Sequence, residues 1–317
     1  MGELPDSYPL PGLPEHVTIY EVGPRDGLQA ETRIVDTATK IEFIRRLRTT
    51  GLTTIETTSF VSPSWVPQLA DATEVLSGIG APEGFRHPVL VPNQRGMDRA
   101  LEAGAAEIAI FVSATETFAQ KNLATTVDGA IETAGSVARQ ASEAGIPVRG
   151  YVSMCFGDPW EGRVPLGRVV DVVRRLADLG CRTISLGDTI GVGTPGHVRA
   201  LLDALGNAGI AMDRLALHLH DTYGQALAGV LEGLRCGITE FDAAAGGLGG
   251  CPFAKSATGN LATEDLVWML TGLGIETGVD LDALVQISGW MAEQLDRPSP
   301  SRVVKALYRE SAPDPLF

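Results

Sequence analysis

Short runs of aliphatic and β-branched residues recur along the chain, separated by longer segments in which apolar residues return every three or four positions. Runs of the first kind are typical of strands, and the longer spacing is typical of helices. The pattern predicts eight strands, at residues 17–22, 53–60, 88–92, 107–114, 147–154, 182–188, 215–221 and 238–245. It predicts helices, each ending in a glycine, at residues 39–51, 125–145, 166–180, 196–209 and 225–237.

Alternation of strands and helices predicts a parallel sheet built through right-handed crossovers. Eight such units favour a closed (β/α)8 TIM barrel, an α/β fold in which functional residues gather at the carboxyl ends of the strands. An open doubly wound sheet is the alternative, although its usual glycine-rich turn after the first strand is absent. We expect residues 1–16, which contain four prolines, to form an extended arm, and residues 17–317 to form a single barrel domain. From about residue 279 the pattern predicts extra C-terminal helices.

The composition is that of an ordinary globular protein, with 44% hydrophobic residues and a formal net charge of −14. Nucleic acid and anionic membranes attract basic surfaces, so neither is expected as a partner, whereas local arginines can still meet a small polyanionic substrate. No apolar run reaches the roughly eighteen residues of a membrane helix, and the first residues do not resemble a signal peptide, which favours a cytoplasmic protein. The cysteines are too widely spaced to indicate a disulfide framework or a zinc ribbon: Cys155, Cys181, Cys236 and Cys251.

Two of the five histidines lie two residues apart in the segment LHLHD, at residues 217–221. Side chains at positions i and i+2 of a strand share one face, so His218 and His220 are expected to point to the same side. If Leu217 and Leu219 face the surrounding helices, both imidazoles enter the barrel. The pair suits either a metal site or two hydrogen-bonded core histidines.

Two other polar residues offer oxygen ligands to such a site. Asp26 follows the first predicted strand in GPRDG, and Asn260 lies in ATGNLATED. Asp26 can equally form a turn or cap a helix, and Asn260 can cap the next helix, as Thr263 or Glu264 also can. Imidazole, carboxylate and amide donors without a thiolate favour Mg²⁺ or Mn²⁺ over structural zinc. Four protein ligands leave two octahedral positions for a chelating substrate.

Six stretches carry a resemblance to a known family: EVGPRDGLQAE, IETTSFVSPSWVPQLAD, RGYVS, ISLGDTIGVGTPG, HLHDTYGQALA and GLGGCPFAKSATGNLATEDLVWML. Together they span most of residues 17–275. They resemble the 3-hydroxy-3-methylglutaryl-CoA lyase family, within the superfamily of barrel-shaped metal-dependent lyases and Claisen-condensing enzymes. The resemblance implies a homodimer that binds Mg²⁺ or Mn²⁺ through four side chains, those of Asp26, His218, His220 and Asn260. It also implies retro-Claisen cleavage of 3-hydroxy-3-methylglutaryl-CoA, or a closely related branched 3-hydroxyacyl-CoA, to acetyl-CoA and acetoacetate or another 3-keto acid.

Such a cleavage needs a base for the tertiary alcohol and positive charge beside the thioester carbonyl. We expect Asp26 or His218 to accept the proton, and the sequence does not rank them. Arg25, adjacent to Asp26, is expected to place its guanidinium on the carbonyl, although an arginine here can also form a surface salt bridge.

The remaining candidates are acids at barrel-strand positions, together with a cysteine and several polar residues whose roles the resemblance implies. Glu56 and Asp188 are expected to orient Arg25 and the substrate. Cys251, in the glycine-rich segment GGLGGCP, is expected to protonate the enolate, although a single cysteine is more often a small buried hydrophobic residue. Polar positions that match family substrate contacts, or that simply form hydrogen bonds at strand ends, are Gln29, Ser59, Tyr151, Ser153 and Thr189.

Two other functions remain open. A Claisen-condensing acyltransferase, such as an isopropylmalate or citramalate synthase, runs related chemistry toward bond formation. Those chains usually continue into a regulatory domain and lack the GLGGCP segment. A non-catalytic metal-binding or CoA-binding barrel is the second alternative, which the complete set of acids, together with Arg25 and Cys251, disfavours.

Overall fold

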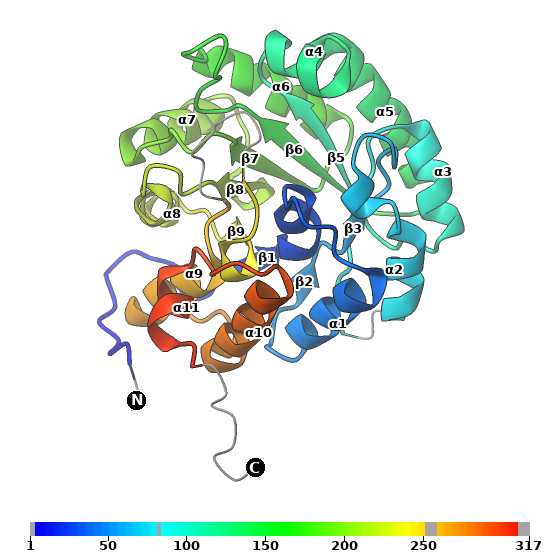
Figure 1. Ribbon diagram of the computed structural model, residues 1–317. Coiled ribbons are helices and arrows are strands. Elements are labelled where there is room, and N and C mark those ends of the chain that lie inside the picture. The colour runs from blue at the N-terminus through cyan, green and yellow to red at the C-terminus, as the bar shows by residue number, and fades with distance from the viewer. Residues whose placement is uncertain (1–3, 81–83, 251–258, 310–317) are drawn as a thin grey trace.

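A ring of short parallel strands occupies the centre of the computed structural model, which describes residues 4–80, 84–250 and 259–309 (Figure 1). All pairings between its strands are parallel. The strands are β1 (Thr18–Glu21), β2 (Thr54–Ile55), β3 (Thr58–Ser59), β4 (Val89–Leu90), β5 (Ile108–Ser113), β6 (Val148–Ser153), β7 (Thr183–Asp188), β8 (Leu215–Leu219) and β9 (Glu240–Ala243).

The sheet closes on itself. Its order is β2-β1-β9-β8-β7-β6-β5-β4-β3, and its two ends, β2 and β3, are consecutive pieces of one segment. Between them, the Glu56 amide donates to the Glu21 carbonyl at 2.8 Å and the Thr57 amide donates to the Pro88 carbonyl at 3.0 Å. The predicted eight-stranded barrel is confirmed. The prediction of one continuous strand over 53–60 is wrong, because residues 54 and 55 pair with β1 whereas residues 58 and 59 pair with β4.

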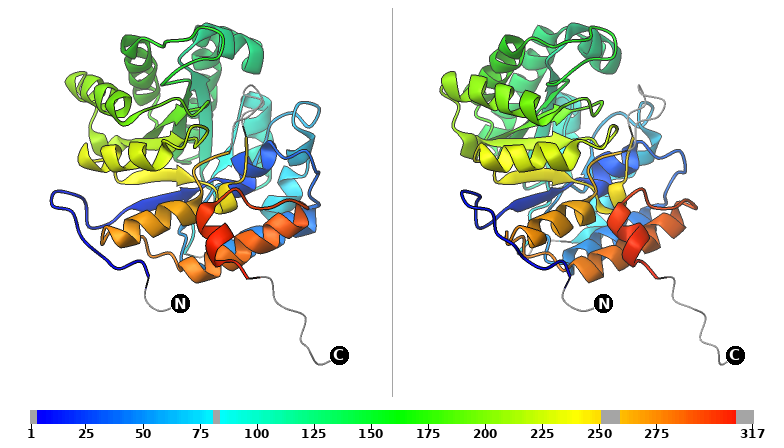
Figure 2. Two further views of the ribbon diagram at one scale, coloured as in Figure 1. Left: turned by 60° about the vertical axis from the view of Figure 1, so that its left-hand side comes forward. Right: turned by 90° about the vertical axis from the view of Figure 1, so that its left-hand side faces the viewer.

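Helices surround the ring, as two further views also show (Figure 2). They are α1 (Thr37–Arg48), α2 (Ala72–Ile79), α3 (Gln94–Glu102), α4 (Glu116–Leu123), α5 (Val127–Glu143), α6 (Leu166–Asp178), α7 (Pro195–Asn207), α8 (Ala226–Arg235), α9 (Thr263–Gly272), α10 (Leu281–Gln294) and α11 (Arg302–Leu307). The five helices predicted from spacing correspond to α1 and α5 to α8, and the predicted C-terminal helices are α10 and α11. Within the described ranges, no helix has the length and apolar character of a membrane span.

Apolar spacing explains why the helices pack where they do. In α6, Val169, Val172, Val173 and Leu176 recur every three or four positions and are buried. Such a stripe faces the sheet because burying it removes apolar surface from water, at about 25 cal/mol for each Å². The core therefore lies between the strands and the helices, and the space inside the barrel is left to other side chains.

Two buried carboxyl groups anchor the turn that follows β9. Glu21 accepts hydrogen bonds from the amides of Gly23 (2.7 Å) and Ala245 (2.9 Å). Glu264 accepts from the Gly246 amide at 2.9 and 3.0 Å and from the Ser288 hydroxyl. Burial raises the pKa of Glu21 to about 7 and that of Glu264 to about 8, although the hydrogen bonds act in the opposite direction. The short 3-10 turn η4 (Ala245–Gly247) is thus held by side chains from both ends of the chain.

The raised pKa of Glu264 predicts a pH-dependent stability. A carboxyl group whose pKa is raised by folding stabilises the protein fully below its unfolded pKa, and this contribution is lost as pH rises through the folded value. For Glu264 the window runs from 4.5 to about 8. Glu264→Gln keeps an oxygen for Gly246 and Ser288 but does not ionise. Its free energy of unfolding, relative to the parent, should rise across the window by up to about 1.4 kcal/mol for each pH unit.

Urea unfolding followed by circular dichroism, from about pH 5 to about pH 9, measures this difference. Glu143→Gln, which removes an exposed carboxylate from α5, is the matched control for loss of charge. A difference between Glu264→Gln and the parent that stays constant over the whole range would contradict the prediction.

Candidate active site and metal centre

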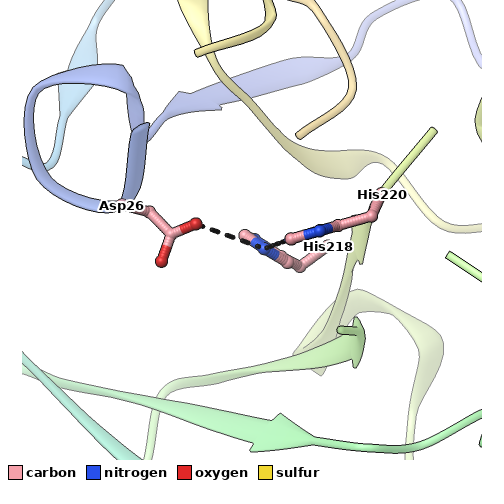
Figure 3. Close-up of side chains that lie close together, drawn as sticks. All are labelled: Asp26, His218 and His220. Carbon is pink, nitrogen blue, oxygen red and sulfur yellow. Dashed lines mark hydrogen bonds and ion pairs between the residues drawn. The ribbon is translucent and has the colours of Figure 1, made fainter. Parts of the chain in front are cut away.

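Three side chains with metal-binding atoms meet at the carboxyl ends of the strands (Figure 3). Asp26 lies in η1 (Gly23–Gly27), a π-helical turn directly after β1, whereas His218 lies in β8 and His220 follows it. One ligand atom from each lies within 4.8 Å of the others. Nε2 of His218 is 3.2 Å from Nε2 of His220 and 3.9 Å from Oδ2 of Asp26. These three groups form a candidate metal site.

The alternation of β8 aims both histidines inward. Leu217 and Leu219 are buried on the opposite face, toward α8. A Cβ added at Gly233 of α8 would lie 2.6 Å from Leu217, and one at Gly229 would lie 2.9 Å from Leu219. The two glycines therefore let the helix approach the leucines closely, which fixes the face of the strand that carries the histidines, as the sequence predicted.

Asn260 lies beside the three groups, paired with His220 in an isolated antiparallel bridge. Its Nδ2 donates to Oδ2 of Asp26 and to the Leu248 carbonyl, both at 3.0 Å. The alternative role as a helix cap is wrong, because Ala262 is the N-cap of α9 and no side chain caps it. Oδ1 of Asn260 and Nδ1 of His220 are buried and have no hydrogen-bond partner among the described residues. An orphaned amide oxygen beside two imidazoles is a donor set that suits a bound cation.

Arg25 is buried, with 5% of its surface exposed, so its alternative role as a surface salt-bridge partner is wrong. Nη2 donates to Oε2 of Glu56 at 2.7 Å, and Nη1 donates to Oδ1 of Asp26. The guanidinium carbon lies 5.3 Å from the ring centroid of Tyr151, whose hydroxyl donates to the same Glu56 oxygen at 2.8 Å. Burial opposes its charge, but Glu56 and Asp26 outweigh it and raise the pKa of Arg25. The guanidinium group of Arg25 is thus held in place by two carboxylates.

The pKa values of the three candidate ligands follow from their neighbours. Burial would raise the pKa of Asp26, but Arg25 and the two imidazoles lower it below its usual range. Burial would lower the pKa of His218, but contacts with Asp242 and Asp26 raise it. Burial, reinforced by His218, lowers the pKa of His220 to about 4. An ionised carboxylate beside a neutral imidazole is the state that metal binding requires.

The second ring nitrogen of His218 has a partner that the sequence analysis did not identify. Nδ1 lies 3.1 Å from Oδ2 of Asp242, a buried residue of β9. Oδ1 of Asp242 accepts from Nη2 of Arg149 at 2.5 Å, and Oδ2 accepts from the Ser185 hydroxyl at 2.7 Å. The available signal was the presence of charged residues inside predicted strands: Asp242, with Glu240, in 238–245 and Arg149 in 147–154.

Of the other expected catalytic residues, Glu56 contacts Arg25, and Asp188 contacts its own loop. Asp188 accepts from the amides of Val192 (3.0 Å) and Gly193 (2.8 Å), and burial raises its pKa to about 6. Its expected contact with the substrate stays a prediction. Cys251 lies outside the described residues.

The residues expected to contact the substrate differ in their surroundings. Tyr151 lies against Arg25, as described, and its ring meets that of His218 edge to face, with centroids 6.1 Å apart. The Thr189 hydroxyl accepts from the Met154 amide at 2.9 Å, and that of Ser59 accepts from the Val61 amide at 3.3 Å, as strand-end groups do. Ser153 ends β6 half-buried, and Gln29 is exposed just after η1. Their roles as substrate contacts stay predictions.

A family model described as HMGL-like matches residues 16–290. A curated Arabidopsis thaliana protein, named mitochondrial hydroxymethylglutaryl-CoA lyase, is 50% identical over 303 residues, which cover 96% of this chain but only 64% of the relative, less than two thirds of its length. A crystal structure of hydroxymethylglutaryl-CoA lyase from Pseudomonas aeruginosa aligns at a TM-score of 0.91 and 45% identity, over 93% of this chain and 98% of that one.

A second solved structure shows a bound ligand. It is an HMG-CoA lyase from Acinetobacter baumannii in complex with coenzyme A and 3-methylmalate, with a TM-score of 0.88 and 38% identity over 96% of this chain and 98% of that one. Matches in sequence and in structure thus run along nearly the whole barrel. The chain belongs to the HMGL-like family.

Proposed function

We propose that the protein is a divalent-metal-dependent lyase that cleaves 3-hydroxy-3-methylglutaryl-CoA, or a closely related branched 3-hydroxyacyl-CoA, to acetyl-CoA and acetoacetate or another 3-keto acid. One observation carries the proposal: the buried Arg25 pairs with Asp26, directly beside the two imidazoles. The chain is about half identical to named hydroxymethylglutaryl-CoA lyases. Its candidate metal site also lies beside a fixed positive charge.

Asp26, His218, His220 and Asn260 are the residues that would hold Mg²⁺ or Mn²⁺. Asn260 would contribute Oδ1, the buried oxygen that has no other partner in the described ranges. Such a cation, when bound, acidifies a coordinated alcohol and orients the carbon to carbon bond that breaks. Two oxygen donors and two imidazoles, without a thiolate, support these two ions rather than structural zinc.

The geometry supports Asp26 rather than His218 as the proton acceptor. Nδ1 of His218 faces Asp242, so Nε2 alone points into the site. An imidazole nitrogen has one lone pair and cannot share it between a cation and a proton. A carboxylate has two oxygens and several lone pairs, so Asp26 can bind a cation and still receive the proton of the alcohol.

Arg25 would stabilise negative charge on the thioester carbonyl as the carbon to carbon bond breaks. Glu56 and the Tyr151 ring hold its guanidinium before substrate arrives, and preorganisation of this kind is the source of large electrostatic effects in catalysis. Cys251 would protonate the acetyl-CoA enolate, and Glu56 would act through Arg25. The homodimer and the cytoplasmic location stay predictions, since the names of curated relatives include both cytoplasmic and mitochondrial forms.

The direct test is an assay with purified protein, Mn²⁺ and 3-hydroxy-3-methylglutaryl-CoA. Acetoacetate should form, a chelator should abolish its formation, and added Mn²⁺ should restore it. Condensation of acetyl-CoA with a keto acid, in the absence of cleavage, would instead indicate a synthase. Ligand binding without turnover would indicate a non-catalytic barrel.

Arg25→Met should lower turnover by about 10² to 10³-fold, because it removes a preorganised donor from the developing oxyanion. The Kd for Mn²⁺ should change far less, since Arg25 offers no ligand atom and removal of its positive charge beside the site offsets the loss of its hydrogen bond to Asp26. Steady-state kinetics and calorimetric titration with Mn²⁺ separate the two effects. Arg139→Met, which removes an exposed arginine from α5, is the control. Turnover equal to that of the parent would rule out the proposed role of Arg25.

Gly249→Ala should weaken metal binding through Asn260. Gly249 has a φ of +106°, and an added Cβ would lie 2.7 Å from Nδ2 of Asn260. Gly209→Ala is a matched control, because Gly209 has a φ of +84° and no atom lies within 4 Å of the added Cβ. Both variants should lose about 1 to 2 kcal/mol of stability from left-handed strain.

Only Gly249→Ala should also raise the Kd for Mn²⁺, by at least about tenfold. Thermal unfolding measures the shared loss of stability, and titration with Mn²⁺ measures the difference. Equal Mn²⁺ affinity in the two variants would show that the position of Asn260 does not matter to the cation.

A further inference from the structure

Hydrogen-bond chemistry around Asp242 dictates where the proton of His218 sits. Arg149 can only donate, so Oδ1 of Asp242 must accept from it, at 2.5 Å. Oδ2 accepts from the Ser185 hydroxyl at 2.7 Å and faces Nδ1 of His218 at 3.1 Å. Two atoms without hydrogens cannot form a hydrogen bond, so neutral His218 carries its proton on Nδ1. Nε2 is then left with a free lone pair directed toward His220 and Asp26.

The frame around Asp242 cannot easily rotate. Arg149 is 2% exposed, and its guanidinium carbon lies 4.0 Å from the ring centroid of Tyr20 and 5.2 Å from that of Tyr151. Its other arm pairs with Glu240. Ladder register places His218 directly opposite Asp242 in the neighbouring strand. Buried structure therefore fixes the position of the Asp242 carboxylate and the donor that each of its oxygens faces.

We propose that Asp242, held by Arg149 and Ser185, is a positioning residue that fixes the tautomer and the ring orientation of His218, so that Nε2 is presented unprotonated to a divalent cation. The inference rests on the proposed function, because it deepens the metal site without adding a ligand. Outer groups of this kind orient imidazole ligands in metalloproteins, and their loss typically costs about 10 to 100-fold in metal affinity.

Asp242→Asn tests the proposal with almost no change of shape. The single amide oxygen should stay with Arg149, which cannot face an NH₂ group. The NH₂ group then faces Ser185 and Nδ1 of His218, and Nδ1 must accept. The proton should move to Nε2, where it blocks the lone pair that faces the cation. We expect the Kd for Mn²⁺ to rise by about 10 to 100-fold.

Glu107→Gln is the matched control. It makes the same carboxylate-to-amide change at a buried acid that pairs with a different arginine, Arg86, and that has no described contact to His218. It should keep the Mn²⁺ affinity and the His218 tautomer of the parent. Calorimetric titration with Mn²⁺ gives the affinities, and circular dichroism with thermal unfolding shows that each variant is folded.

Nitrogen NMR of ¹⁵N-histidine-labelled, metal-free protein at about pH 9 reports the tautomer directly. The chain has five histidines, so the His218 signals can be identified by their loss in His218→Gln. The parent should show a protonated Nδ1, and Asp242→Asn should show a protonated Nε2. If Asp242→Asn does not fold, the tautomer of His218 in the parent protein still tests the proposal.

A parent His218 protonated on Nε2 would overturn the proposal, as would an Asp242→Asn variant with the tautomer and the Mn²⁺ affinity of the parent. Failure of the parent to bind Mn²⁺ would overturn the proposed metal function instead. In that case the tautomer measurement would still test the contact between Asp242 and His218.

Discussion

The pairing of β9 with both β1 and β8 is the constraint on which the site depends. β1 delivers Asp26 at its carboxyl end, and β8 delivers His218, although nearly two hundred residues separate them in sequence. Parallel register fixes their heights, since Asp242 of β9 lies opposite Tyr20 of β1 on one side and His218 of β8 on the other. A shift of one residue would turn either histidine away from the barrel interior. Closure of the sheet is therefore a condition for the chemistry.

Much of this arrangement could be predicted from local patterns. The two-residue period of LHLHD predicted the inward histidines, and the strand and helix spacing predicted the barrel, because both patterns reflect burial within one segment. The break between β2 and β3 could not be predicted, because it depends on which neighbour each amide of 53–60 meets. The π-helical turn that carries Asp26 was likewise hidden, since a short GPRDG segment is compatible with several turns.

The contacts of Asp242 and Asn260 could not be predicted from the sequence for a different reason. Each depends on partners far along the chain, Arg149 in one case and Asp26 in the other. A sequence shows a polar residue inside an apolar strand, but it does not show which buried group neutralises it. Burying a charge without a partner is costly, so such residues signal that a partner exists without identifying it. Residue types could be assigned from the sequence, whereas their pairing required the fold.

Two networks of buried charges contact the candidate metal ligands, one through Asp26 itself and the other through the contact of Asp242 with His218. Arg25 lies between Glu56 and Asp26, and Arg149 lies between Glu240 and Asp242. Counted in their ionised forms, two guanidinium groups face four carboxylates, which leaves two negative charges.

Tyr151 lies near both guanidinium groups, 5.3 Å from that of Arg25 and 5.2 Å from that of Arg149, so the two networks share one ring. A divalent cation held by the candidate ligands would offset the excess negative charge of these two networks. The barrel thus combines apolar packing outside the strands with buried ion pairs inside, and the excess negative charge of these two networks gives a physical reason for a cation to bind beside them.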